Sequence, residues 1–225
     1  MKMNDYLKFI DYSFQQEDSP YKANTDTAVL GMFMDNMKNK TLLDIGTNTG
    51  ALLLYGHYHG AKRLIGVDIH EDALDLAKKN LERYTDDYEL HLSRVQDLAI
   101  DKVDVIVCNP PFFEMNNVTT DEYLKEAMFE SSLPMEDLFS SFRRLMKANG
   151  EVYLIYQADR FPQVYEMCKA HKLKIMKMAF VHDINSHHAL RVLLKLKIGP
   201  MSKLKILDPI LIDRGDFVDL KELRK

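Results

Sequence analysis

The stretch from Val103 to Phe113 places the tightest limit on how this chain can fold. It opens with a short, continuous, β-branched run that ends at Cys108 and is followed by Asn-Pro-Pro-Phe-Phe. Such a run favours a strand that is buried on both faces of a parallel sheet. A proline cannot donate to a sheet ladder, so the strand has to end at Asn109. Asn109 is therefore expected at the carboxyl end of a central strand, where open α/β sheets bind their ligands.

The residues that end this strand suit recognition of a planar amino group. The Asn109 carboxamide and the Pro110 carbonyl offer two acceptors, which can hold both hydrogens of an NH2 group. Pro111 stiffens the chain behind them, and the Phe112 ring can stack on the flat body that carries the amine. We therefore expect a catalytic group of Asn109, Pro110, Pro111 and Phe112. The same residues are also compatible with a plain strand-ending turn in which Phe112 and Phe113 belong to the core.

A second constraint is a nucleotide-binding unit near the start of the chain. It comprises a strand over 41–45, a Gly-Thr-Asn-Thr-Gly turn over 46–50, a helix from about 48 to 58 and a strand over 63–67. Glycines in such a turn let the backbone pass close to a ligand. Asp68 ends the second strand and can accept hydrogen bonds from both hydroxyls of a ribose. Asp44 would repel a dinucleotide pyrophosphate, whereas a cationic ligand would tolerate or favour it.

The remaining pattern alternates helices and strands. Apolar periodicity predicts helices over 26–38, 71–84, 135–147 and 161–171, the third ended by Asn149-Gly150. Residues 114–134 have no strong period and are expected to form a mobile connection with a short helix around 121–130. Strands are expected over 88–92, 151–156, 173–181 and 189–198, the last two as an antiparallel edge pair, with a short apolar segment over 203–212. This order predicts an α/β fold with a doubly wound, seven-stranded, mostly parallel sheet. We expect residues 1–39 to form an N-terminal extension with a helix packed on a domain over 40–225.

Composition narrows the class of protein. No apolar run approaches the roughly 18 residues that a membrane span needs, and the N-terminus lacks a signal-peptide core. Cys108 and Cys168 have no metal-ligand spacing and are expected as reduced residues of a cytoplasmic protein. The histidines of the 182–188 segment are expected to be exposed loop residues rather than metal ligands, and no metal is predicted. No obligatory protein partner is indicated.

Charge is distributed unevenly along the chain. The net charge is −4, yet residues 1–142 carry 13 Lys and Arg against 25 Asp and Glu, whereas residues 143–205 carry 13 against 4. A basic region in an acidic protein is compatible with a partner that bears phosphates, and equally with a solvated basic face that has no partner.

The glycine turn and the Asn-Pro-Pro-Phe stretch together resemble a known superfamily. Asp-x-Gly-x-Asn-x-Gly from Asp44, followed by an acid-terminated strand, is similar to motifs one and two of S-adenosylmethionine-dependent class I methyltransferases. The resemblance implies S-adenosyl-L-methionine as cofactor, S-adenosyl-L-homocysteine as product, and Asp97 as reader of the adenine amino group, although Asp97 could instead start a helix. Lys22 and Asp26 could line the cofactor mouth or be a solvated lysine and a helix cap. The expected cofactor-binding residues are Lys22, Asp26, Asp44, Gly46, Asn48, Gly50, Asp68, Ile69, Asp97 and Asn109.

A narrower resemblance covers residues 20 to about 217. The segments 24–27, 191–194 and 208–217 are similar to the bacterial tRNA1(Val) adenine-N6 methyltransferases. This implies methylation of an adenine, at position 37 beside the anticodon, with the tRNA anticodon loop as substrate. Phe112 stands where tyrosine is commoner in that family, and Asn48 replaces a more usual glycine. Phe112 keeps the aromatic face that a tyrosine would present. Asn48 is small and polar, and it can still hold the turn in place of glycine.

Three alternatives share part of this pattern. A ribosomal RNA methyltransferase acting on guanine N2 or adenine N6 would also carry Asn-Pro-Pro-Phe. The guanine-N2 enzymes typically have a longer chain. A protein glutamine-N5 methyltransferase uses the same logic, because a glutamine side chain is a planar amide, but generally has a helical N-terminal domain for which 40 residues leave no room. A cofactor-binding module with decayed catalysis would be expected to lack Asn109 or the glycines, and both are present.

Overall fold

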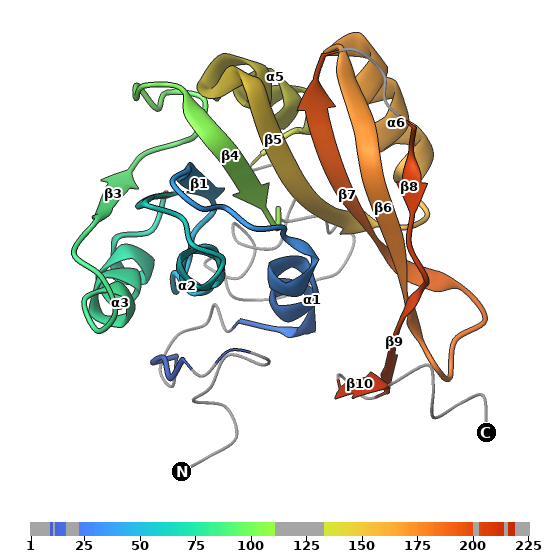
Figure 1. Cartoon of the computed structure of the whole chain (residues 1–225), viewed down its shortest axis with the longest axis horizontal. Helices are drawn as coiled ribbons and strands as arrows, with labels where there is room; N and C mark the ends of the chain where they lie inside the picture. Colours follow the sequence, from blue (N-terminus) through green and yellow to red (C-terminus); the bar gives the residue numbers. More distant parts are fainter. Residues whose placement is uncertain are drawn as a thin grey trace, which may run out of the picture.

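A mixed β-sheet forms the framework of the protein (Figure 1). The computed structural model describes residues 10, 12–16, 23–110, 133–199 and 203–213, and the backbone of 216–218. The strands are β1 (Thr41–Ile45), β2 (Arg63–Asp68), β3 (Tyr88–Leu92), β4 (Val103–Cys108), β5 (Met146–Gln157), β6 (Leu173–Asp183), β7 (Ala189–Ile198), β8 (Lys205–Ile206), β9 (Ile210–Asp213) and β10 (Asp216–Val218).

The strand order confirms the predicted doubly wound sheet. Its main part runs β3-β2-β1-β4-β5-β7-β6, with parallel pairing from β3 to β5 and antiparallel pairing of β7 to both of its neighbours. The seven predicted strands are therefore present. The segment expected to be merely apolar instead supplies β8 and β9, both paired to β6, and β10 pairs with β9. These short strands use the backbone groups that β6 would otherwise expose at the sheet edge.

Helices cover both faces of the sheet (Figure 1). One face carries α1 (Thr25–Phe33), α2 (Ala51–Tyr58) and α3 (Glu71–Leu81), which pack with the odd-numbered β4 side chains Val105 and Val107. The other carries α5 (Met135–Leu145) and α6 (Phe161–Ala170), which pack with Ile106 and Cys108. Because successive strand residues face opposite sides, a central strand with two covered faces must be apolar throughout its buried part.

Several predicted helix boundaries were wrong. Helix α2 begins at Ala51 rather than near residue 48, because Asn48 and Gly50 have positive φ angles of 52° and 77°. Helix α3 ends at residue 81 rather than 84. Helix α5 ends at Leu145, and the Asn-Gly pair expected to end it lies inside β5 instead. The pairing of β5 with β4 jumps over residues 147–150, so that pair occupies an irregularity within the strand.

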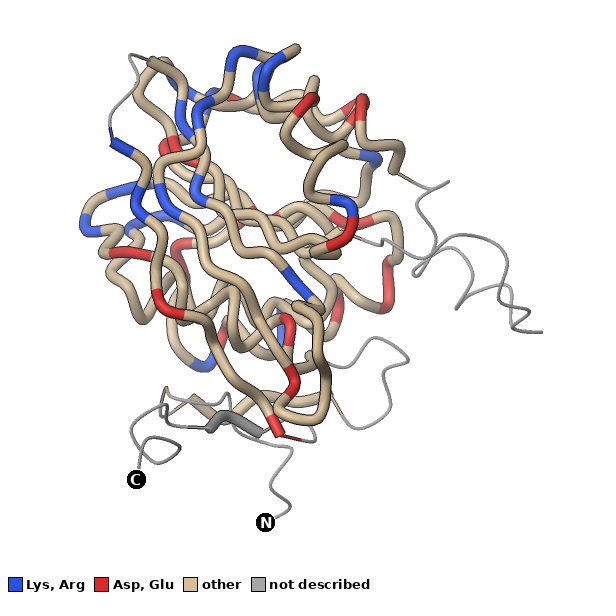
Figure 2. The backbone as a smooth tube through the Cα atoms, turned by 90° about the vertical axis from the view of Figure 1, so that its right-hand side faces the viewer, with Lys and Arg blue, Asp and Glu red and all other residues tan. Residues whose placement is uncertain are grey.

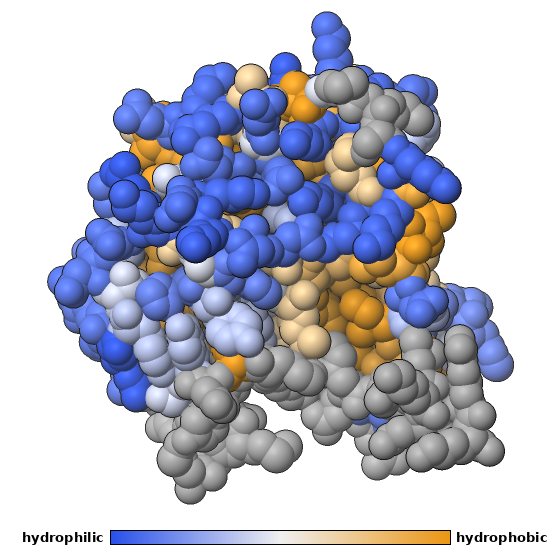
Figure 3. Space-filling model, in the orientation of Figure 1, coloured by the Kyte–Doolittle hydropathy of each residue, from blue (hydrophilic) through white to orange (hydrophobic). Residues whose placement is uncertain are grey.

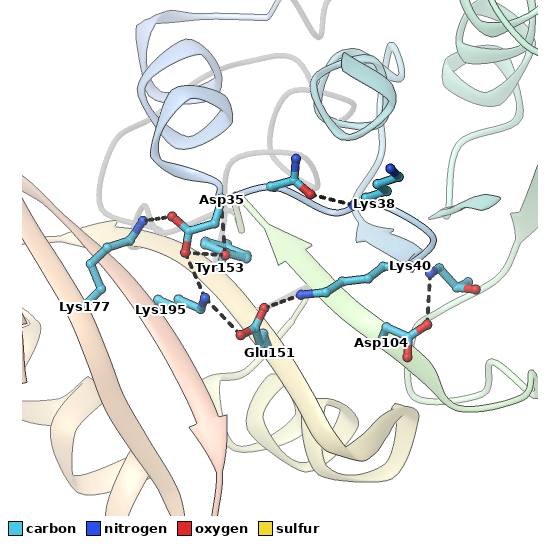
Figure 4. Close-up of polar contacts among 10 residues, drawn as sticks. Asp35, Lys38, Lys40, Asp104, Glu151, Tyr153, Lys177 and Lys195 are labelled. Carbon is cyan, nitrogen blue, oxygen red and sulfur yellow. Dashed lines mark hydrogen bonds and ion pairs between the residues drawn. The ribbon is translucent and has the colours of Figure 1, made fainter. Parts of the chain in front are cut away.

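Helix α1 ends at residue 33, five residues before the predicted end, although the apolar pattern continues. Met34 adopts an extended conformation, and the chain then runs to β1 with Met37 still buried. Asp35 lies in this connection and is held by two lysines of the sheet, Lys177 of β6 at 2.6 Å and Lys195 of β7 at 2.8 Å (Figure 4). Tyr153 donates its hydroxyl to the same carboxylate at 3.1 Å. Tertiary contacts with the sheet therefore override the local helical preference.

The surface contrasts with the two apolar core clusters. On the side that Figure 3 views, hydrophilic side chains form a broad band across the middle, and a smaller apolar area lies below it. Within the described residues, no helix is both long enough and apolar enough to cross a membrane.

We predict that Asp35 stabilises the fold in a pH-dependent way. Hydrogen bonds and charges from Lys177 and Lys195 outweigh the effect of partial burial and hold the pKa of the Asp35 carboxyl well below its usual range. Asp35→Asn should lower the free energy of unfolding at pH 7 by about 1–2 kcal/mol, because Lys177 loses its charged acceptor and Lys195 keeps only Glu151. Solvent screening of the half-exposed Asp35 carboxylate limits the loss. A depressed carboxyl pKa stabilises only above the unfolded value near 4, so the deficit should shrink as the pH falls below about 4.

Urea denaturation across pH 3 to 8 measures this deficit. Asp75→Asn is the matched control, because Asp75 is exposed on α3. A deficit for Asp35→Asn that equals the control, or that does not change with pH, would contradict the assignment.

Candidate functional site

Three strands deliver the candidate residues to one edge of the sheet. Ile45 of β1 pairs with Val67 of β2 on one side and with Cys108 of β4 on the other. The residue that follows Ile45, the first glycine of the turn, is therefore flanked by the acid that ends β2 on one side and by Asn109 on the other. The register brings together residues that lie 63 positions apart in the chain, at the edge where such sheets bind ligands.

The glycine turn is built from three residues with positive φ. These are Gly46 at 71°, Asn48 at 52° and Gly50 at 77°. The amides of Gly46 and Thr47 donate to the Val67 carbonyl at 2.9 and 3.1 Å, which ties the turn to β2. A Cβ added at Gly46 would meet no atom of the described residues within 4 Å, so they leave open space beside the turn, whereas at Gly50 it would come within 3.2 Å of Ala77. Asparagine tolerates the left-handed region better than other non-glycine residues, so Asn48 can replace a glycine here.

Asp44 lies beneath this turn as a buried carboxylate with one free oxygen. Its Oδ2 accepts a hydrogen bond from Thr47 Oγ1 at 2.9 Å, and its Oδ1 has no hydrogen-bond partner among the described residues. Burial raises the pKa of Asp44 to about 7, although the Thr47 hydroxyl acts in the opposite direction. A buried acceptor without a partner is costly in free energy, and a ligand that donates a hydrogen bond or carries positive charge would relieve that cost. The prediction from sequence missed Thr47, which shares the turn with the glycines.

Asp68 ends β2 in a fixed orientation. Its Oδ2 accepts from the Asn48 amide at 2.8 Å, and its Oδ1 accepts from the His70 amide at 3.1 Å. Burial raises the pKa of Asp68, and these backbone hydrogen bonds counteract the rise. Each carboxylate oxygen can still accept a further hydrogen bond, as binding of a ribose diol would require. Ile69 follows with 39% of its surface exposed, so it offers an apolar side chain beside this carboxylate.

Asn80 of α3 is a site residue that sequence reasoning missed. It is fully buried, and its Nδ2 donates to the carbonyls of Thr49 and Gln15, both at 2.9 Å. Its Oδ1 accepts from the Gln15 amide at 2.6 Å. Asn80 therefore joins the glycine turn to the N-terminal segment 12–16. A signal was present, because Asn80 falls on the helix face that carries Ala73 and Ala77, where a polar residue needs a partner.

Asn109 follows β4 with its carboxamide available. The residue is half-buried, the next residue Pro110 is buried, and the Asn109 side chain makes no hydrogen bond to the described residues. Behind it, Cys108 Sγ donates to the Ile45 carbonyl at 3.5 Å, and burial raises the pKa of that thiol well above its usual value. Pro111 and Phe112 lie outside the described residues, so their predicted roles stay predictions.

The structure gives less support to the predicted cofactor roles of Asp97, Asp26 and Lys22. Asp97 is exposed in the turn that follows β3, and no helix begins there. Asp26 lies in the first turn of α1, but it does not cap the helix: Asn24 does, by accepting from the Thr27 amide at 3.1 Å. The Asp26 carboxylate instead pairs with Arg191 of β7 at 2.9 Å. A ligand-binding role for Asp26 stays a prediction, as does that of Lys22, which lies outside the described residues.

The described residues contain no cluster of His, Cys, Asp or Glu that could hold a metal. His187 and His188 are exposed at the turn between β6 and β7, as predicted, whereas His182 is half-buried within β6.

The sheet order and the glycine turn define the Rossmann-like fold of class I methyltransferases. Solved structures agree: a magnesium protoporphyrin IX methyltransferase from Synechocystis, with bound S-adenosylmethionine, has a TM-score of 0.54 at 15% identity over 76% of each chain. A ribosomal protein L11 methylase from Lactobacillus delbrueckii also scores 0.54, at 20% identity over 76% of each chain. The chain matches the methyltransferase small domain over residues 19–177. It belongs to that family.

The chain is also similar to curated proteins that share a single name. A tRNA1(Val) (adenine(37)-N6)-methyltransferase from Christiangramia forsetii is 29% identical over 76% of this chain and 75% of its own. The protein of the same name from Flavobacterium johnsoniae is 27% identical over 95% of this chain and 96% of its own.

We predict that Asn80 is required for the stability of the turn. Asn80→Leu keeps a similar volume but leaves the Thr49 carbonyl and both Gln15 backbone groups without their buried partner. Such a loss should lower the free energy of unfolding by about 1–3 kcal/mol. Urea denaturation measures it, with Lys79→Leu, at an exposed position of the same helix, as control. Equal losses in the two variants would contradict the role of Asn80.

Proposed function

We propose that the protein transfers a methyl group from S-adenosyl-L-methionine to the exocyclic N6 amine of an adenine in tRNA, at position 37 beside the anticodon. The observation that carries the proposal is the available Asn109 carboxamide, followed by a buried proline, next to the glycine turn at the carboxyl edge of the sheet. The names of the curated relatives support the same substrate and the same atom.

The residues at this edge fit the cofactor. S-adenosylmethionine supplies a methyl group that is already activated by its attachment to a positively charged sulfur. The free oxygen of the buried Asp44 and the open space beside Gly46 suit a ligand with cationic groups that passes close to the backbone. We assign the ribose hydroxyls to Asp68 and the adenine to Ile69 and Asp97. The full proposed cofactor set is Lys22, Asp26, Asp44, Gly46, Asn48, Gly50, Asp68, Ile69, Asp97 and Asn109.

Asn109 and Pro110 would activate the amine by accepting its hydrogens. The lone pair of the adenine amine is delocalised into the ring, so the nitrogen is a poor nucleophile while it stays planar. Acceptance of one hydrogen by the Asn109 side-chain oxygen and the other by the Pro110 carbonyl favours a tetrahedral nitrogen with its lone pair free. No base of tuned pKa is needed before attack, because the nitrogen becomes acidic as its new bond forms. The chain chiefly supplies proximity and alignment, worth up to roughly 7–11 kcal/mol in favourable cases.

Base recognition would rest on stacking. Phe112 stands two residues beyond Pro110 in the sequence and can cover the extruded adenine, a contact worth about 1–3 kcal/mol per base. A loop such as the anticodon loop suits this arrangement, because its unpaired bases can be splayed out at low cost in free energy.

Asn109→Ala should abolish methylation while the affinity for S-adenosylmethionine stays within about threefold of the wild type. The carboxamide acts on the amine as it attacks, so its loss removes an interaction with the substrate rather than the cofactor pocket. Single-turnover methylation and calorimetric titration of the cofactor separate the two effects. Comparable weakening of both would mean that Asn109 belongs mainly to the cofactor site.

Asp68→Ala should weaken cofactor binding by about 10- to 100-fold, which corresponds to about 1.5–3 kcal/mol for hydrogen bonds to a charged group. Calorimetric titration with S-adenosylmethionine measures the change, and Asp75→Ala on the exposed face of α3 controls for lost negative charge. An unchanged affinity would remove Asp68 from the ribose role.

Nucleoside mass spectrometry tests the activity itself. After incubation of the protein with S-adenosylmethionine and unmodified bulk tRNA, we expect new N6-methyladenosine, and digestion with a sequence-specific nuclease should place it at position 37. A protein that binds the cofactor but methylates no tRNA would overturn the proposal. Methylation of ribosomal RNA or of a protein glutamine in parallel reactions would then identify the correct substrate class.

A further inference from the structure

Much of the positive charge between residues 143 and 205 is used inside the protein. Lys177 and Lys195 bond Asp35, and Lys195 also bonds Glu151. The other internal pairs are Arg191 with Asp26, Lys147 with Asp104, Lys169 with Glu166, and Arg144 with the carbonyls of Val95 and Leu98. The basic region as a whole therefore cannot be taken as a ligand surface, and the cations that remain have to be located individually.

Three of the remaining lysines lie together on adjacent strands. Lys174 of β6 is directly opposite Lys197 of β7, and Lys205 of β8 is paired with Lys177 of β6. We call Lys174, Lys197 and Lys205 the lysine face. None of the three forms an ion pair with any residue that the structure describes. Figure 2 views the side of the molecule that carries these strands and shows Lys and Arg at neighbouring positions along them.

Two carboxylates on this side of the sheet, Glu151 and Asp35, are already engaged by other lysines. Glu151 of β5 is opposite Lys197 in the register, but its oxygens bond Lys195 and Lys40, both at 2.9 Å (Figure 4). Asp35 bonds Lys177 and Lys195, as described above. Like charges directly across a pair of strands are destabilising, so opposed lysines without a carboxylate between them favour an anion from outside.

This part of the sheet is open on the side of the lysine face. Lys195 and Lys197 alternate along β7 with Leu194 and Leu196, which pack in the cluster beneath α5 and α6. The lysines therefore point to the face of the sheet opposite α5 and α6. Helices α1, α2 and α3 pack on that same face, but they do so over β1, β2 and β5. Lys174 and Lys197 are half-exposed, and Lys205 is exposed.

The sheet register also sets the distance of this face from the proposed site. Lys197, Glu151 and Val105 form one row across β7, β5 and β4. Asn109 lies four residues beyond Val105 and two strands away from β7. With about 3.3 Å per residue and about 4.8 Å between strands, the separation is roughly 15–20 Å. A ligand that spans both places has to be an extended polyanion rather than a single phosphate.

We propose that the lysine face binds the phosphate backbone of the RNA substrate, several nucleotides from the base that is methylated. The proposal rests on the proposed tRNA activity and adds the surface on which the RNA docks. Lysine ammonium groups recognise phosphates as point charges without regard to base sequence, so this face would supply affinity and orientation, whereas the Asn109 edge would select the base.

The test is a triple variant, Lys174→Ala, Lys197→Ala and Lys205→Ala. Binding of full-length labelled tRNA is measured by fluorescence anisotropy at several salt concentrations, and methylation is measured separately. We expect the Kd and KM for tRNA to rise at least tenfold, with kcat and cofactor affinity unchanged. The slope of log affinity against log salt should become shallower by about 2–3, because up to three phosphate contacts are lost at about 0.7–0.9 each.

A matched triple variant controls for net charge. Lys62→Ala, Lys79→Ala and Lys102→Ala also remove three exposed lysines, but these lie on other parts of the described surface. Equal weakening by the two triple variants, or an unchanged tRNA Kd in the first, would overturn the docking surface. Replacement of the three lysine-face residues by arginine should retain binding, which separates lost charge from misfolding.

The two proposals can fail separately. If the wild type methylates tRNA and the lysine-face variant binds it normally, the docking surface falls and the activity stands. If the wild type methylates no tRNA, the activity falls, and anisotropy still decides whether the lysine face binds an RNA backbone.

Discussion

The parallel pairing of β1 between β2 and β4 is the constraint on which the site depends. Ile45 pairs with Val67 and Cys108, so the glycine turn, Asp68 and Asn109 must emerge side by side. Backbone hydrogen bonds then hold the parts together: the turn donates to the Val67 carbonyl, and Asp68 accepts from the Asn48 amide. The site is thus positioned by main-chain geometry, and its side chains remain free to meet a ligand.

The lysines of the sheet fall into two groups, those that form ion pairs with carboxylates and those that do not. Asp35 and Glu151 form ion pairs with Lys40, Lys177 and Lys195, and this network holds the connection after α1 against β5, β6 and β7. Charges paired in this way contribute to stability and are not available to a partner. The lysine face lies on the same side of the sheet: Lys205 is opposite Lys177, and Lys174 and Lys197 are opposite each other two residues beyond Lys195. None of these three lysines forms an ion pair with a described residue. A basic segment in the sequence therefore contains both structural and available cations, and only their pairing tells them apart.

Sequence reasoning succeeded where a local pattern has a single physical solution. The β-branched run ending in Asn-Pro-Pro became the buried central strand β4, because a short β-branched run that two prolines end favours a strand over a helix. It failed at helix ends: α1 stops at residue 33 because Asp35 bonds lysines that lie more than 140 positions away, and the Asn149-Gly150 pair is absorbed into β5. It also offered a helix cap as one of two roles for Asp26, whereas Asn24 caps the helix and Asp26 pairs with Arg191. Each error concerns a long-range contact that no local window contains.

The sequence by itself determined the fold class, the glycine turn and the place of Asn109, because periodicity, proline and glycine act through the local backbone. The tertiary structure decided which side chains are partnered. Only there does a buried Asp44 oxygen lack a partner among the described residues, Asn80 join the turn to residues 12–16, and Lys174 face Lys197. The physical reason is that hydrogen bonds and ion pairs depend on distance in space, which strand order and register set and the linear sequence does not display.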